Sequence, residues 1–503
     1  MLSAAHGGLQ GGWIVDPAFD NHDLSVYLCN ATHSSCPILR ACEYDPVLSA
    51  DAAINGTCGE LGCYACLHKQ LWPPAPNDYL TGVLLVVCGV LAGASGIGGG
   101  GLNVPLLMLA GSFLVEEAVV LSHVAVFGNA IAQNWINARR SHPHSPGRPL
   151  MDFDIPLLLL PAQLGGNALG VLVGPSLPAT GVELLACCLL LFASVKTFLT
   201  ARKAFKRETE EARNSAALAY GTAPPTLNST KQLRDPLVAP SAISSTSAAV
   251  AQDVAREVAR PEAADAAAAA AVDLEALQTA AFPSCTVAMK KLTALAVLWS
   301  SLVLLFLGSN YYSKGKGKCA PASLAFIFAQ LAAVLVAACA AAVWLMRDQR
   351  RNTALALPGD MHWSASSAVG LPCMGAVIGA VAGLLGLGGG ELMAPLLLVV
   401  GMLPQVASAT SALMVLFTSS SNVVHYVIKG VLSPDPGYVS AALIIGFSSA
   451  LCGRLLALRL VRKLSHPSII AFVLGGVLLV ALALLIVNMT RDKVEWSFSS
   501  ICK

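Results

Sequence analysis

The stretch Gly93-Ala-Ser-Gly-Ile-Gly-Gly-Gly-Gly101 interrupts a long apolar run, and Gly383-Leu-Leu-Gly-Leu-Gly-Gly-Gly-Glu391 interrupts another near the C-terminus. A proline follows each stretch at the same spacing, at Pro105 and at Pro395. One constant shift in numbering superimposes the glycines and prolines of the two copies, so the chain contains an internal repeat. Paired glycine interruptions of apolar segments in two halves of a chain indicate the binding site of a membrane transporter.

The composition around these stretches is that of a membrane protein. The chain has 503 residues, of which 55% are hydrophobic and only 12% are charged, and its mean hydropathy is +0.66. Soluble domains carry about 25% charged residues. Only helices and closed barrels satisfy their backbone groups in lipid, and these apolar runs lack the alternation of barrel strands. We therefore expect an all-α, polytopic membrane protein with two inverted repeats and glycine-broken helices.

Hydropathy divides the chain into five parts. Some apolar segments are shorter than the ~20 residues of a full span, so the glycines separate either two short helices or a broken helix and a re-entrant arm. A segment rich in Ser, Thr, Pro and Ala has too few large apolar side chains to build a core. The parts are a cysteine-rich segment (1–78), a first transmembrane repeat (79–200), a disordered linker (201–286), two additional helices (287–346) and a second repeat (367–489).

Basic residues predict the orientation, because they concentrate in cytoplasmic loops. If residues 1–78 lie on the lumenal or extracellular side, the basic clusters after the third segment, around the linker and before the second repeat all become cytoplasmic. Lys314, Lys316 and Lys318 are the exception. The first repeat then begins outside and the second begins inside, which is the inversion that alternating access uses.

The segment 1–78 has the pattern of an oxidising compartment. Sequons at Asn30 and Asn55 predict glycosylation, and an even number of nearby cysteines predicts disulfide bonds whose pairing stays open. Zinc is the alternative, since Cys63-x-x-Cys66 has ligand spacing with His68 nearby. The sequons favour disulfides, so we expect no metal. The six cysteines are Cys29, Cys36, Cys42, Cys58, Cys63 and Cys66.

The glycine stretches and the segments after them supply the candidate substrate site. Free N–H groups and the positive dipole end of a helix attract an anion, and glycine allows its close approach. Hydroxyl and amide side chains can also bind an oxyanion; the alternatives are tight helix packing and interhelical hydrogen bonds worth roughly 1 kcal/mol. The candidates are Ser95, Gly98, Gly99, Gly100, Gly101, Asn103, Ser122, Asn129, Gly388, Gly389, Gly390, Thr410, Ser411 and Ser419.

Ionisable residues within apolar segments are functional candidates in membranes. Glu391, His123 and His425 are candidates for proton coupling, with packing as the alternative for each histidine. Charged residues near segment ends extend toward the interface; this is our expectation for Glu183, Lys196, Arg454 and Arg459. No catalytic or ATP-binding motif is present, so we expect neither an enzyme nor a cofactor.

The repeated Gly-x-Gly-Gly-Gly with its downstream proline resembles the sulfite exporter TauE/SafE family, most closely at Gly386–Gly390 and Ala407-Ser-Ala-Thr-Ser411. Cys63-Tyr-Ala-Cys66-Leu-His-Lys69, followed by Trp72-Pro73, looks like the cysteine motif of the plant and algal branch. The resemblance implies export of a small anion such as sulfite or an organosulfonate. Gly101 stands where the second repeat has Glu391, so the two half-sites differ at this position.

We therefore expect a secondary transporter whose partners are a small anion and the lipid bilayer. A homo-oligomer is compatible with the sequence. The net charge of +2 gives no reason to expect nucleic-acid binding. Two alternatives remain: a membrane-anchored receptor or scaffold that acts through the cysteine-rich segment, and an anion channel.

Overall fold

The computed structural model describes residues 40–44, 64–113, 115–143, 145–173, 179–219, 285–313, 321–351, 364–385, 389–429, 435–464 and 468–491. Met1–Phe205 and Cys285–Lys503 form one compact unit, and Lys206–Ser284 forms another. Both sequons and four of the six N-terminal cysteines (Cys29, Cys36, Cys58 and Cys63) lie outside the described residues. Gly388 lies outside them too.

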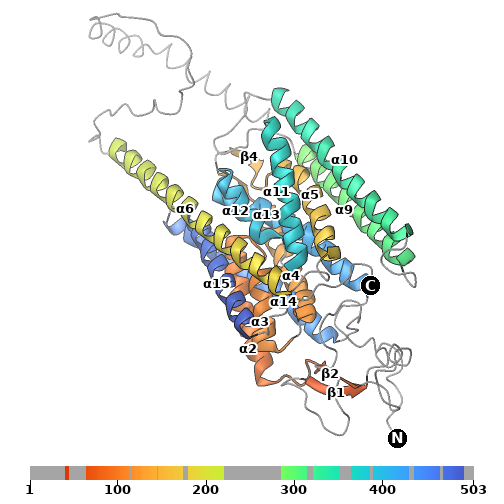
Figure 1. The fold of residues 1–503 in the computed structure, drawn as a ribbon. Coiled ribbons are helices and arrows are strands. Elements are labelled where there is room, and N and C mark those ends of the chain that lie inside the picture. The colour runs from red at the N-terminus through yellow and green to blue at the C-terminus, as the bar shows by residue number, and fades with distance from the viewer. Residues whose placement is uncertain are drawn as a thin grey trace, which may run out of the picture. The chain divides into compact units, whose positions relative to one another are not determined.

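The described chain is almost entirely helical (Figure 1), and eight of its helices are long and apolar enough to cross a membrane. The first half contains α2 (Pro76–Ser95), α3 (Gly100–Gly111), α4 (Val115–Asn137), α5 (Asp154–Val173) and α6 (Ala179–Ala219). Two helices follow, α9 (Cys285–Ser313) and α10 (Pro321–Arg351). The second half contains α11 (Ala365–Leu385), α12 (Gly390–Val399), α13 (Pro404–Lys429), α14 (Pro436–Leu464) and α15 (Ile469–Arg491).

Two short antiparallel ribbons complete the described structure. β1 (Arg40–Tyr44) pairs with β2 (Tyr64–His68), and β3 (Ser141–His142) pairs with β4 (Ser145–Pro149) between α4 and α5. α6 continues to Ala219, into the segment that the sequence assigns to the linker. Its Glu, Arg, Lys and Ala residues are good helix formers, which accounts for the extension.

The first glycine stretch makes a sharp turn between α2 and α3. Gly96, Gly98 and Gly99 have φ values of 90°, 89° and 87°, a left-handed conformation that glycine adopts without steric cost. The last residue of α3, Gly111, lies against Thr81 in the second turn of α2. α3 therefore returns alongside α2, and the two helices form a re-entrant hairpin with the glycines at its tip. α12, with 10 residues, is likewise too short to span a membrane.

α2, α4 and α14 run in the same direction. Widely spaced contacts along α14 occur in the same order along the other two helices. These contacts join Tyr438 to Asp78 and Gly453 to Val90 for α2, and Gly446 to Ala125 and Arg454 to Asn137 for α4.

α5, α11 and α13 run the opposite way. They are mutually parallel, and α13 is antiparallel to α4. Each of these three helices is therefore antiparallel to the helix at the equivalent position of the other repeat. This confirms that the repeats are inverted. The contacts are Gly375 with Leu159 and Gly379 with Gln163 for α11 and α5, Thr410 with Asp152 and Asn422 with Asn167 for α13 and α5, and Ala412 with Asn134 and Tyr426 with His123 for α13 and α4.

Helices of one half pack on helices of the other half: α2 packs on α14, and α11 packs on α5. Glycine permits this, since a β-carbon on Gly453 would overlap the carbonyl oxygen of Val90, and one on Gly170 would overlap that of Ala380. Val90 and Ala380 correspond in the repeat, so Gly170 and Gly453 occupy equivalent positions. Small residues at close helix contacts are the usual packing device in membranes.

The two glycine stretches meet in space. A β-carbon on Gly390 would lie 3.0 Å from the carbonyl oxygen of Ile97, in the middle of the first stretch. Val415 of α13 touches both stretches, because its Cγ1 would contact a β-carbon at Gly98 and its Cγ2 would overlap one at Gly390. The described tips of both broken helices are therefore adjacent, as a shared site requires.

Candidate functional site

Serines of α13 contact the first glycine stretch. The Ser411 hydroxyl donates to the carbonyl oxygen of Gly96 at 3.0 Å, and a β-carbon on Gly96 would lie 2.7 Å from the carbonyl oxygen of Ser408. Both serines are buried. The polar face of α13 therefore meets the tip of the first hairpin.

Arg454 of α14 lies directly behind Ser408 and is fully buried. Its Nη1 donates to the Ser408 hydroxyl at 2.8 Å, while its Nε and Nη2 donate to Oδ1 of Asn137 at 3.1 and 2.7 Å. The expectation that Arg454 extends toward the interface is wrong, because the side chain turns inward to these two acceptors. Arg459, further along the same helix, is exposed.

The Arg454 guanidinium has unused hydrogen-bonding capacity. A guanidinium carries five N–H groups, and three of them donate to Asn137 and Ser408. No carboxylate of the described residues forms an ion pair with it. Nδ2 of Asn137 is also buried with no hydrogen-bond partner in the described part of the chain. The site thus holds a cation and unused donors without a counter-charge.

Such an arrangement is energetically expensive. The effective cost of burying one ion is several kcal/mol unless it is compensated. The charged neighbour that acts most on Arg454 is another cation, Arg140, which gives Arg454 no compensating negative charge. Uncompensated intramembrane charges mark substrate and ion pathways. An anion would neutralise this site.

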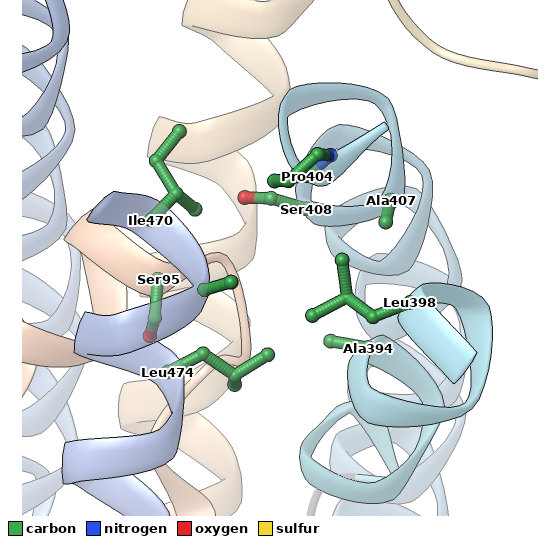
Figure 2. A pocket seen from close by; sticks show the side chains of 9 residues that line it. Ser95, Ala394, Leu398, Pro404, Ala407, Ser408, Ile470 and Leu474 are labelled. Atoms are coloured by element: carbon green, nitrogen blue, oxygen red, sulfur yellow. The ribbon is translucent and has the colours of Figure 1, made fainter. Parts of the chain in front are cut away.

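A small pocket lies beside the same residues (Figure 2). Ser95 and Ser408 line it, and Leu474 and Ile470 of α15 face Leu398 and Ala394 of α12 across it. Pro404, Ala407 and Ala471 complete the lining. The space between these side chains is too narrow to hold a water molecule. Ser408 is buried, and this pocket leaves no room for a solute beside it.

The other predicted binding residues are buried, and most bond to backbone groups. Asn103 lies within α3, and Gly98 to Gly101 form the tip of the hairpin and the start of α3. Gly389 and Gly390 lie at the start of α12. The hydrogen bonds are Ser95 to Leu91 at 3.0 Å, Ser122 to Gly100 at 3.3 Å, Asn129 to Gly89 at 3.4 Å, Thr410 from the Asp152 amide at 3.0 Å, and Ser419 to Val415 at 2.6 Å.

These bonds separate the predicted residues into two groups. Ser122 and Ser411 bond directly to the glycine tip or the helix after it, and Ser95 immediately precedes the tip. Ser419 bonds backward within its own helix, as serine and threonine commonly do. Asn129 reaches α2 instead. Ser95, Ser122 and Ser411 therefore remain site candidates, whereas Asn129 and Ser419 have packing contacts.

The two histidines make aromatic contacts between helices. Nδ1 of buried His123 donates to the Val119 carbonyl at 2.8 Å, and its ring meets the edge of Tyr426 with centroids 5.5 Å apart. The ring of His425 stacks on that of Phe306, with the ring centroids 3.6 Å apart. The Glu391 side chain lies outside the described atoms. Proton coupling through these three residues stays a prediction.

A charged cluster lies at the start of α5, next to the polar segment of α13. Asp154 pairs with Lys291 at 2.5 Å, and Asp152 pairs with Arg148 at 3.5 Å. Burial, followed by the repulsion of Asp154, raises the pKa of Asp152 to about 6. The backbone amide of Asp152 donates to Thr410, so this cluster touches the candidate site.

The elevated pKa of Asp152 predicts a pH-dependent stability. The folded state holds the proton more tightly than the unfolded state does, so it gains stability as pH falls through about 6 toward 3.8 and loses it at neutral pH. We expect Asp152→Asn to raise the Tm by a few degrees at about pH 7.5, with a smaller gain at about pH 5. Thermal unfolding in detergent measures this. A gain that is equal at both pH values would contradict it.

The cysteine motif before α2 leads into a contact with the first hairpin. Nε2 of His68 donates to the Gly111 carbonyl at 2.9 Å, and its ring stacks on Phe113 with centroids 4.0 Å apart. Lys69 forms a 2.6 Å ion pair with Asp78. In the preceding ribbon, Cys42 is directly opposite Cys66 in register. The disulfide, glycosylation and zinc interpretations of residues 1–78 remain predictions.

Comparison with known proteins identifies the family. The family model described as sulfite exporter TauE/SafE matches residues 81–229 and 269–485. Among curated proteins of Arabidopsis thaliana, Sulfite exporter TauE/SafE family protein 3 is 27% identical over 467 residues, 87% of this chain and 86% of that protein. Family protein 5 is 26% identical over 407 residues, 79% of this chain and 80% of that protein. No solved structure matches the chain significantly.

The family match covers both helical halves, and the relatives align over most of their lengths. This agrees with the inverted repeats, the adjacent glycine tips and the apolar helices described above. The chain belongs to the sulfite exporter TauE/SafE family and is a multi-pass membrane transporter, not an enzyme.

Proposed function

We propose that this transporter moves a small sulfur-containing oxyanion, such as sulfite or an organosulfonate, as a gradient-driven secondary carrier and in the direction of export. One observation carries the proposal: Arg454 is buried beside the first glycine tip with two N–H groups to spare and no carboxylate partner among the described residues. The relatives' names, which contain "sulfite exporter", support the choice of solute.

The chemistry of the site favours an oxyanion over a cation or a neutral solute. The unused guanidinium and amide donors of Arg454 and Asn137 lie next to Ser408, and planar guanidinium groups suit oxygens carried on one central atom. The closed pocket beside Ser408 is lined mostly by apolar side chains, which favours a solute of few atoms. We further propose, from the distribution of basic residues among the loops, that residues 1–78 lie on the lumenal or extracellular side and the linker in the cytoplasm.

Flux through proteoliposomes that contain the purified full-length chain tests the proposal. Sulfite, sulfate, thiosulfate and an organosulfonate are compared at two pH values. A carrier gives saturable uptake and counterflow, because the solute binds before each conformational change. Uptake that does not saturate and lacks counterflow would identify a channel. Absence of flux for all four anions would favour the receptor or scaffold alternative.

A further inference from the structure

Gln163 of α5 lies against the second glycine stretch. A β-carbon on Gly389 would lie 2.6 Å from Nε2 of Gln163, so the side-chain amide lies directly against this glycine. Gly389 is the N-cap of α12, has φ of 64° and provides no side-chain cap for that helix. Gln163 is fully buried. Its amide is therefore directed at the N-terminus of α12.

Both polar atoms of this amide lack partners. Neither Nε2 nor Oε1 of Gln163 has a hydrogen bond within the described ranges. One turn later on the same helix, Asn167 donates to Asn422 at 2.9 Å. Leaving a buried donor or acceptor unsatisfied costs about 1–3 kcal/mol. Of the side chains named here, only Gln163 has that cost at both of its polar atoms, Nε2 and Oε1.

The backbone around Gln163 packs closely against α11. α5 and α11 pack so closely that a β-carbon on Gly379 would overlap the carbonyl oxygen of Gln163. This contact fixes the position from which the side chain projects. The first N–H groups of α12 also lack intrahelical acceptors, as at every helix N-terminus. Donors from α12 and a donor–acceptor pair from Gln163 thus face the same place.

The acceptor in this group restricts the ligand. A fully deprotonated oxyanion would be attracted by N–H groups but repelled by the carbonyl oxygen of Gln163. An oxyanion that carries one O–H group satisfies both atoms, since the amide N–H donates to a bare oxygen and the amide oxygen accepts from the hydroxyl. Such complementary pairing discriminates strongly against analogues that lack the hydroxyl.

We infer that Gln163 is a specificity-determining residue that binds the singly protonated form of the oxyanion at the N-terminus of α12. This inference rests on the proposed function and adds the protonation state of the solute. Its site adjoins the first glycine tip, because Gly390 lies next to Ile97.

The test compares Gln163→Met with the wild type in proteoliposomes. Methionine has a similar length but makes no amide hydrogen bonds. Two singly charged solutes are used: hydrogen sulfite, which carries an exchangeable proton, and methanesulfonate, which has no O–H group. We expect the wild-type sulfite rate to follow the hydrogen form as pH is varied. We expect Gln163→Met to lower that rate about tenfold or more, and the methanesulfonate rate less than about twofold.

The outcomes separate this inference from the proposed function. If the wild type moves neither solute, the proposed function fails. If the wild type moves sulfite, with or without methanesulfonate, and Gln163→Met leaves sulfite transport unchanged or lowers both rates equally, only the role of Gln163 fails. Thermal unfolding of the variant tests whether it is folded, which distinguishes a selective loss of transport from misfolding.

Discussion

Arg454→Met is expected to abolish transport of the anion while leaving the protein folded. Truncating one partner of a buried charge interaction costs about 2–5 kcal/mol, which corresponds to a loss of roughly thirtyfold to more than a thousandfold in affinity. Replacing a buried, uncompensated charge with an apolar side chain is often neutral or stabilising for the fold. The Tm of this variant should therefore equal or exceed that of the wild type.

Two further variants sharpen the test. Arg454→Lys keeps the charge but cannot reproduce the planar fork that bonds Asn137 and Ser408, so we expect partial transport at least tenfold below wild type. Arg459→Met removes an exposed cation from the same helix and should change flux less than about twofold. Wild-type flux in Arg454→Met would show that the buried cation has no part in binding the solute.

Arg454 also breaks the symmetry of the repeats. Because Gly170 and Gly453 are equivalent, the counterpart of Arg454 is Val171, an apolar residue. The two half-sites are therefore chemically different. One tip has a cation and serines, and the other has the Gln163 amide. The sequence raised this question at Gly101 and Glu391, but the larger difference lies on α5 and α14.

Sequence reasoning predicted the repeat, the breaks and the inversion because they depend on local signals. Glycine runs, apolar segments and basic loops are visible in any membrane chain. It could not choose between two short helices and a broken helix with a re-entrant arm, because that depends on where α3 packs. The contact of Gly111 with Thr81 supplies the answer.

Arg454 was missed because several cations follow it near the end of an apolar segment. The helical periodicity of α14 contained a signal that Arg454 is buried. Gly446 and Gly453 lie two turns apart and mark the face that packs against other helices, and Arg454 falls on that face. Gln163 gave no such signal, since a single uncharged residue in a helix becomes informative only when its partners are known.

The hydroxyl-rich segment of α13 is a second case in which the sequence alone was insufficient. The sequence identifies a polar helix, yet it does not fix the rotation of that helix. Ser411 and Ser408 meet the glycine tip, whereas Thr418 and Ser419 bond to carbonyls one turn back in α13. The rotation of α13 is set by its packing against α4 and α9, and composition does not predict that packing.

Gly390→Ala is expected to lower transport at least tenfold, and Val415→Ala in the same chain is expected to restore much of it. A β-carbon at Gly390 would overlap Cγ2 of Val415 and press on the Ile97 carbonyl at 3.0 Å. Overpacking of a well-packed contact typically costs 1–3 kcal/mol, and here the strain falls where the two tips meet. Removing the Val415 methyl groups relieves the larger of these clashes.

Gly370→Ala is the matched control, because it is a helical glycine of α11 with no atom within 4 Å of an added β-carbon. It should retain wild-type flux and gain up to about 1 kcal/mol of helix stability. Proteoliposome flux and thermal unfolding of the four chains measure these effects. If Gly390→Ala behaves like Gly370→Ala, or if Val415→Ala fails to rescue it, the tips do not meet as described. A carrier mechanism built on their contact would then lose its physical basis.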